Sequence, residues 1–172
     1  APGLKPVHID GEIWTADHKG RVTAVDAGSG DRLRQFDLDM ELSAGPSLVG
    51  QRVLLGTMNG QVLVLDRETG VIDWRAQLSS EILAAPLQRD GVIVVRCIDG
   101  RVFGLNADTG LREWVYDRSV PLLTLRGNSE PVVRGGQVFI GHDDGTLTAL
   151  SLADGQLLWE QRIGTPEGRN QL

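Results

Sequence analysis

The sequence predicts an all-β protein made of four copies of one structural unit, and three observations support this prediction. Glycine is abundant, with 22 among 172 residues, and it falls at regular intervals. Four prolines recur at spacings of 40, 40 and 45 residues, which is the period of a repeat architecture. Short runs rich in Val, Ile and Leu lie between these markers and show no helical periodicity. The marker prolines are Pro6, Pro46, Pro86 and Pro131.

Further markers keep the same register as the prolines. A glycine follows each proline by 14 residues, a second glycine follows it by 24, and a tryptophan follows the last three prolines by 28. These residues are Gly20, Gly60, Gly100 and Gly145, then Gly30, Gly70, Gly110 and Gly155, then Trp74, Trp114 and Trp159. Agreement among independent markers predicts four repeats, at approximately residues 6–45, 46–85, 86–130 and 131–165.

Each repeat is expected to hold four short strands. In the second repeat these strands are residues 46–49, 52–57, 61–66 and 71–78, with turns between them. Asn-Gly and Asp-Gly pairs favour tight hairpin turns, because glycine adopts positive φ angles at no steric cost. The turns after the second strands are Lys19-Gly20, Asn59-Gly60, Asp99-Gly100 and Asp144-Gly145. Every connection within a repeat is therefore expected to be an antiparallel hairpin.

The second and third strands of the repeats are apolar along their whole length. Runs such as VIVVRC, QVLVLD and QVFIGH show little alternation of polar and apolar residues. Such runs are typical of strands that are buried on both faces. Four antiparallel strands in about 40 residues, covered on both faces by identical neighbours, predict the blades of a β-propeller.

Two recurring side chains have structural explanations. The tryptophans lie in the fourth strand of their blades, where a large flat ring is expected to pack between adjacent blades. In the first repeat Arg34 stands where the others have tryptophan, so the joint after that repeat is expected to differ. The polar residue that ends each third strand is expected to bond backbone amides of the following turn. These residues are Asp26, Asp66, Asn106 and Ser151.

Composition and motifs argue against several classes of function. Interspersed charges, 17 basic and 23 acidic for a net charge of −6, are unlike a nucleic-acid-binding or anionic-membrane-binding surface. Cys97 lies in an apolar run and is expected to be a small buried residue. The three histidines occupy unrelated repeat positions, and Asp143-Asp144-Gly145 fills a hairpin turn, so we expect no metal site. No nucleophile elbow or phosphate loop occurs, so we expect no catalytic residues, no cofactor and no enzyme activity.

One insertion interrupts the regular spacing. Five extra residues fall between Trp114 and Pro131, in the neighbourhood PLLTLRG at 121–127. Insertions of this kind map to loops on one face of a propeller, often the binding face. The leucines could fold down and cap the core, or they could form an exposed apolar patch beside an arginine, which is the composition of a protein-binding anchor.

The repeats resemble a known superfamily. The segments AVDAGSG, VLDRETGVIDW, GLNADTGLREW and ALSLADGQLLW are similar to the tryptophan-docking repeat of pyrroloquinoline-quinone (PQQ) dehydrogenases. The stretch VPLLTLRGNSEPVV, followed by a blade and GQLLWEQRIG, resembles the BamB family of the outer-membrane β-barrel assembly machinery. The cofactor-binding relatives carry a pair of adjacent cysteines and acidic metal ligands, and this sequence departs from that pattern because it has one cysteine.

The BamB resemblance implies a specific function. Members of that family are non-enzymatic, eight-bladed lipoprotein scaffolds on the periplasmic side of the outer membrane of Gram-negative bacteria. They bind the periplasmic domains of BamA and assist outer-membrane β-barrel insertion, and unfolded outer-membrane proteins are a second implied partner. The family residues that contact BamA match Leu123, Leu125 and Arg126 here. Two alternatives stay open, namely a fragment of a PQQ-dependent dehydrogenase propeller and a generic propeller module that binds proteins.

Four repeats instead of eight lead to an expectation about completeness. Blades of an eight-membered ring have narrow wedge angles, so four of them should form an open half-ring with unpaired edge strands. The lipid-anchor cysteine is missing near Ala1, and Cys97 cannot replace it. We therefore expect either a piece of a longer chain or association through the terminal blades.

Overall fold

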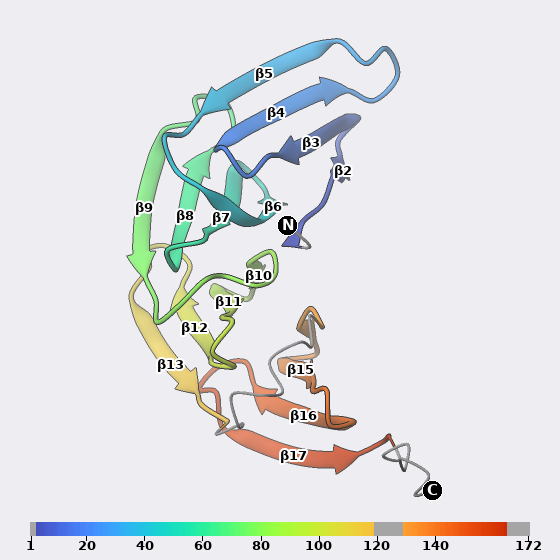
Figure 1. Ribbon diagram of the computed structural model, residues 1–172, viewed down its shortest axis with the longest axis vertical. Coiled ribbons are helices and arrows are strands. Elements are labelled where there is room, and N and C mark those ends of the chain that lie inside the picture. Colours follow the sequence, from blue (N-terminus) through green and yellow to red (C-terminus); the bar gives the residue numbers. More distant parts are fainter. Residues whose placement is uncertain (1–2, 119–128, 165–172) are drawn as a thin grey trace, which may run out of the picture.

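The structure is a computed structural model that describes residues 3–118 and 129–164. Its strands form four antiparallel sheets that follow one another along an open arc (Figure 1). The fourth and outermost strands of the sheets lie on the convex side of the arc, namely β5 (Arg32–Asp37), β9 (Ile72–Gln77), β13 (Arg112–Tyr116) and β17 (Leu157–Arg162) (Figure 1). The prediction of an all-β fold made of four-stranded antiparallel blades is confirmed. Among the described residues there is no helix long and apolar enough to span a bilayer.

Each sheet is a meander in which consecutive strands are neighbours. The first sheet holds β2 (Val7–Ile9), β3 (Glu12–Ala16), β4 (Arg21–Asp26) and β5 (Arg32–Asp37). The second holds β6 (Leu42–Val49), β7 (Arg52–Thr57), β8 (Gln61–Asp66) and β9 (Ile72–Gln77). The third holds β10 (Leu87–Arg89), β11 (Val92–Arg96), β12 (Val102–Asn106) and β13 (Arg112–Tyr116). The fourth holds β14 (Val132–Arg134), β15 (Gln137–Gly141), β16 (Thr146–Ser151) and β17 (Leu157–Arg162).

One strand was not expected from the repeat pattern. The short β1 (Gly3–Leu4) adds to the second sheet and pairs in parallel with β6, with Gly3 opposite Ala44 and Leu4 opposite Gly45. The second sheet therefore has five strands. Two residues without a hairpin partner carry too weak a pattern to be recognised as a strand in a sequence.

The hairpin turns depend on glycine where the sequence predicts it. Gly60, between β7 and β8, has a φ of 80°, and a Cβ at this position would lie 2.6 Å from the carbonyl oxygen of Ser80. Any other residue there would be strained by its φ and would also clash with the backbone. The equivalent glycines of the other three sheets also have positive φ angles.

Side chains cap three of the turns between the third and fourth strands as predicted. The Asp66 carboxylate accepts hydrogen bonds from the backbone amides of Glu68 (2.9 Å) and Thr69 (2.8 Å). Asp26 and Asn106 accept equivalent pairs of bonds in the first and third sheets. In the fourth sheet no described residue makes such a bond to the Ser151 side chain. A serine hydroxyl is shorter than the carboxylate or amide at the other positions.

The hydrophobic core is divided into three clusters, one at each joint between neighbouring sheets. Within β7, Val53 and Leu55 pack toward the first sheet, whereas Leu54 packs toward the third. This arrangement confirms that the apolar runs of the second and third sheets are buried on both faces. In the fourth sheet the prediction is wrong for β15, where only the alternate residues Val138 and Ile140 are buried. Cys97 belongs to the cluster between the second and third sheets, where burial raises the pKa of its thiol to about 11.

Two of the three marker tryptophans, Trp74 and Trp114, join neighbouring blades as predicted. The Trp74 ring covers Gly110 of the third sheet, and its Nε1 donates to the carbonyl of Ala107 at 3.1 Å. Trp114 repeats this contact on the fourth sheet, where its Nε1 donates to the carbonyl of Leu152 at 2.8 Å. A Cβ on either covered glycine would overlap the indole ring. The second glycine markers of the third and fourth repeats, Gly110 and Gly155, are thus required by the tryptophan of the preceding blade.

The joint between the first and second sheets uses different chemistry, as Arg34 suggests. The ring of Phe36 covers Gly70 in place of a tryptophan. Arg34 pairs with Glu68 of the second sheet at 3.0 Å and with Glu12 of its own sheet at 2.7 Å. Arg67 of the second sheet completes this network with a 2.8 Å bond to Glu12. An aromatic ring and a charged network together replace the indole.

Glu12 is expected to stabilise this joint in a pH-dependent way. Hydrogen bonds from Arg34 and then from Arg67 lower the pKa of Glu12 to about 2, below its usual 4.5. A lowered pKa stabilises the folded state above pH 4.5, and the stabilisation is lost as the pH falls toward 2. Between pH 6 and pH 3 the destabilisation caused by Glu12→Gln should therefore shrink by about 2 kcal/mol. Urea denaturation at both pH values measures this difference.

A surface pair provides the control for that experiment. Arg21 and Asp37 form an ion pair of 2.9 Å, but both side chains are more than half exposed. Asp37→Asn should change stability very little at neutral pH, because water screens such exposed pairs. A cost of Glu12→Gln that is the same at pH 6 and pH 3 would contradict the assigned pKa.

Candidate partner-binding surface

The predicted binding residues lie outside the part of the chain that the structure describes. Leu123, Leu125 and Arg126 fall within residues 119–128, between the third and fourth sheets. The structure does describe the two ends of this segment, which are Arg118 after β13 and Ser129 before β14. The candidate site is therefore built from the contacts that hold these two ends. We call them the Arg118 clasp, in which Arg118 contacts Asp144 and Glu160, and the Ser129 clasp, in which Arg96 contacts Ser129.

Arg118 ties the first end to the fourth sheet. Its Nη2 atom pairs with Asp144 at 3.0 Å and with Glu160 on β17 at 3.4 Å. The Arg118 side chain is only 19% exposed, so water screens these pairs less than it would at an open surface. Hydrogen bonds from Thr146 and then from Arg118 lower the pKa of Asp144 to about 2. Asp144 therefore stays charged and holds Arg118 at neutral pH.

Arg96 ties the second end to the third sheet. Arg96 ends β11, and its Nη1 atom donates to both the carbonyl and the hydroxyl oxygen of Ser129, each at 2.7 Å. The Ser129 hydroxyl in turn donates to the carbonyl of Gly141 at 2.6 Å. Arg96 is buried, and burial lowers the pKa of its guanidinium, although an arginine keeps its charge in proteins.

His142 lies among the same charged groups. Its Nε2 atom is 2.9 Å from the hydroxyl of Thr148, which donates to Glu160 at 3.1 Å. Burial, and then the positive charges of Arg118 and Arg96, lower the pKa of His142. The imidazole is therefore neutral at pH 7. No set of three or more His, Cys, Asp or Glu within residues 3–118 and 129–164 is placed to hold a metal ion.

Sequence reasoning missed the two arginines that hold the segment. Arg96 sits in the apolar run VIVVRC, and a charged residue at the end of a buried strand was the available signal. Buried arginines are rarely found without several acceptors, so such a residue predicts a polar clasp. The acceptors could not be named, because Ser129 and Gly141 are far away along the chain.

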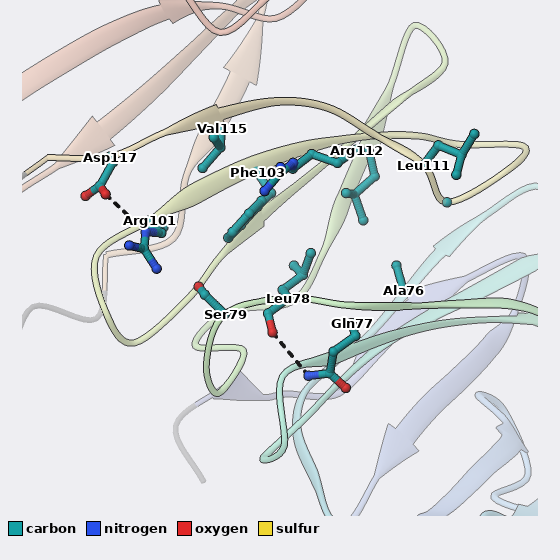
Figure 2. A pocket seen from close by; sticks show the side chains of 12 residues that line it. Ala76, Gln77, Leu78, Ser79, Arg101, Phe103, Leu111, Arg112, Val115 and Asp117 are labelled. Carbon is teal, nitrogen blue, oxygen red and sulfur yellow. Dashed lines mark hydrogen bonds and ion pairs between the residues drawn. The ribbon is translucent and has the colours of Figure 1, made fainter.

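A groove of about 740 Å³ lies between the second and third sheets (Figure 2). Ala76 and Leu78 line one wall, and Phe103, Leu111 and Val115 line the other. An ion pair of 3.1 Å between Arg101 and Asp117 lies at one end of the groove (Figure 2). The groove follows β13, the outermost described strand of its sheet. The groove therefore combines apolar side chains with the edge of β13, a strand that pairs with β12 alone among the described strands.

The family model for the outer membrane protein assembly factor BamB matches residues 18–172. BamB of Xanthomonas campestris pv. campestris is 47% identical over 98% of this chain and 44% of its own length. BamB of Alkalilimnicola ehrlichii is 49% identical over 100% of this chain and 45% of its own length. The chain thus spans about half the length of the curated relatives that it matches.

The comparison with solved structures also finds a BamB protein. The crystal structure of BamB from Moraxella catarrhalis has a TM-score of 0.86 and 26% identity over 95% of this chain and 50% of that chain. The quinohemoprotein alcohol dehydrogenase of Comamonas testosteroni, with 18% identity and a TM-score of 0.72 over 92% of this chain and 34% of its own, shares the fold alone. A family model that covers most of the residues, relatives near half identity and a matching fold agree: the chain belongs to the BamB family of outer membrane protein assembly factors.

Proposed function

We propose that this chain is a non-enzymatic scaffold that acts in outer-membrane protein assembly by binding the periplasmic domains of BamA. The observation that carries this proposal is an identity of 47% to 49%, over nearly the whole chain, to proteins that bear the name of that assembly factor. The proposed location is the periplasmic side of the outer membrane of a Gram-negative bacterium. BamB proteins of Escherichia coli and Salmonella typhimurium are similar to this chain, which supports that location.

The proposed contact residues are Leu123, Leu125 and Arg126. Leucine side chains supply apolar area to an interface, and an arginine can donate two parallel hydrogen bonds to one carboxylate, which lysine cannot. The clasps at Arg118 and Ser129 support this assignment, because they attach the two ends of the segment to the fourth and third sheets. Fixed ends reduce the conformational entropy that a loop loses when it binds a partner.

Direct binding to purified BamA periplasmic domains tests the proposal. The 172-residue chain should bind them saturably in isothermal titration calorimetry, and added PQQ and calcium should produce no bound chromophore. A chromophore that co-elutes with the protein would favour the dehydrogenase alternative. No heat of binding at high micromolar concentrations of both proteins would contradict the proposed partner.

The clasp at Ser129 should matter more for binding than for stability. Ser129→Ala removes one donor and one acceptor beside Arg96, so we expect a stability loss of about 1 kcal/mol and a clearly weaker affinity for BamA. Ser43 offers a matched control, because its buried hydroxyl donates to the carbonyl of Ile82 at 2.8 Å, at the joint between the second and third sheets. Ser43→Ala should lose similar stability and keep its affinity. Equal affinities of the two variants would show that the clasp does not position the segment.

A second proposal concerns unfolded outer-membrane proteins as partners. The groove beside β13 supports it, since an extended peptide can add to a strand edge while apolar side chains hold its alternate residues. A fluorescent peptide from a barrel strand should bind the chain, and Leu111→Asp should weaken binding. Leu33→Asp, at an exposed position on β5, is the control. If no peptide binds the wild type at high micromolar concentration, the groove has no such role.

A further inference from the structure

One position of the repeat carries a different chemical group in each of the four sheets. The residue eleven positions after each marker proline, where the turn between the second and third strands begins, is Asp17, Thr57, Cys97 or His142. A hydrogen bond from the backbone amide of Arg21 lowers the pKa of Asp17. Threonine does not titrate, and burial raises the pKa of Cys97 to about 11. Of these four side chains, only His142 can change its charge between about pH 5 and pH 7.

His142 begins a chain of hydrogen bonds that leads to the Arg118 clasp. Its Nε2 atom lies 2.9 Å from Oγ1 of Thr148, a residue that is fully buried. Thr148 donates its hydroxyl hydrogen to Glu160 at 3.1 Å, so its oxygen accepts the bond from His142. Nε2 therefore carries a hydrogen, and Nδ1 is the atom that takes up a proton in acid. Glu160 in turn pairs with Arg118 at 3.4 Å.

The groups around His142 oppose its protonation. Among the described residues, the charged neighbours are Arg96 at the end of β11, Arg118 after β13, Asp143 and Asp144 on the same turn, and Glu160 on β17. Burial of the ring and then the two arginines outweigh the carboxylates, so the pKa of His142 lies below its usual 6.5. The neutral ring therefore stabilises the folded site above pH 6.5, and this stabilisation falls as the pH drops toward the lowered pKa.

We propose that protonation of His142 opens the Arg118 clasp, so that this joint acts as an acid-sensitive switch. A charged ring that stays in place repels the guanidinium of Arg118 and competes with it for the two carboxylates. A charged ring that moves into water takes away the bond that orients the Thr148 hydroxyl toward Glu160. Both responses weaken the hold on Arg118, which lies at the start of segment 119–128.

A double-mutant cycle, measured by urea denaturation at pH 7.5 and pH 5, tests the switch. In the wild type, the factor by which Arg118→Gln raises the unfolding equilibrium constant should be at least about threefold smaller at pH 5, a size typical of coupled neighbours. In the background of His142→Gln this factor should be the same at both pH values. The glutamine amide can donate to Thr148 but does not titrate. Titration of the carboxylates occurs in both backgrounds, so the comparison cancels it.

His18→Gln is the matched control. His18 is an exposed histidine on the turn between β3 and β4, which corresponds to the turn of His142 in the fourth sheet. This variant should keep the pH response of the wild type. The switch is overturned if the cost of Arg118→Gln in the wild type is the same at both pH values, or if it changes equally in the His142→Gln background.

Affinity for the periplasmic domains of BamA provides a second readout, which rests on the proposed function. Calorimetry should show that the wild type binds at least about threefold more weakly at pH 5 than at pH 7.5, and that His142→Gln loses less affinity. An equal loss in both proteins would overturn the control of binding by His142. Absence of binding at either pH, with the expected result of the cycle, would contradict the proposed function and still support the switch.

Discussion

Replacing Trp114 with alanine is expected to lower the free energy of unfolding by about 3–5 kcal/mol, the usual cost of removing a large buried aromatic side chain. Trp114 is 6% exposed and packs in the cluster between the third and fourth sheets. The substitution leaves a cavity over Gly155 and leaves the carbonyl of Leu152 without its indole donor. Chemical denaturation at neutral pH measures the loss. It should be the largest effect of any tryptophan substitution in the outer strands.

Trp159 provides a control at the same position of the repeat. Its ring is 41% exposed, so Trp159→Ala should cost no more than about 1 kcal/mol. The comparison separates the docking of the ring from the intrinsic strand preference of tryptophan. Similar costs for the two substitutions would contradict the assignment of Trp114 as a joint between blades.

The strands and turns could be predicted because the same pattern occurs four times. Glycines with positive φ, such as Gly60 and Gly110, have no good substitute, so their spacing reports the positions of the turns directly. Apolar runs without alternation correctly predicted strands covered on both faces in the second and third sheets, but not β15 of the fourth. Both signals come from residues that are close together in the sequence, and four occurrences in one register are not expected by chance.

Contacts between distant residues could not be predicted in the same way. Arg34 marked the first joint as different, but its pairing with Glu12 and Glu68 depends on how two sheets are oriented. The coverage of Gly70 by Phe36 requires a shift of two residues from the tryptophan position, which the repeat pattern does not contain. The clasp of Arg96 on Ser129 likewise joins residues that only the fold brings together.

The candidate site was found from an irregularity in the spacing and from a resemblance. The five-residue insertion identified where the chain departs from its own repeat, and the resemblance of LTLRG gave individual residues a role. The structure adds the two clasps at the ends of that segment. The contact of Leu123, Leu125 and Arg126 with BamA remains a proposal.

Substituting Leu123, Leu125 and Arg126 together with alanine is expected to abolish binding to the periplasmic domains of BamA while leaving the melting temperature nearly unchanged. Each leucine would contribute about 1.5–3 kcal/mol when fully buried against a partner, and the arginine adds a directional charged contact. Two leucines that capped the core would behave differently, because such losses cost about 2–5 kcal/mol of stability each. Melting temperature and affinity therefore distinguish the two interpretations of the segment.

A second triple variant provides the matched control. Leu33→Ala, Leu111→Ala and Arg112→Ala remove the same types of side chain from exposed positions on the first and third sheets. This control should keep both its melting temperature and its affinity for BamA.

The measurement that tests the proposed function most directly is calorimetric titration of the BamA periplasmic domains with the wild type and both triple variants, after thermal melting of the same samples. We predict that only the Leu123, Leu125 and Arg126 variant loses binding and that all three proteins melt at nearly the same temperature. A stable variant that still binds would contradict the assignment of the interface, and a large drop in its melting temperature would show that the leucines cap the core.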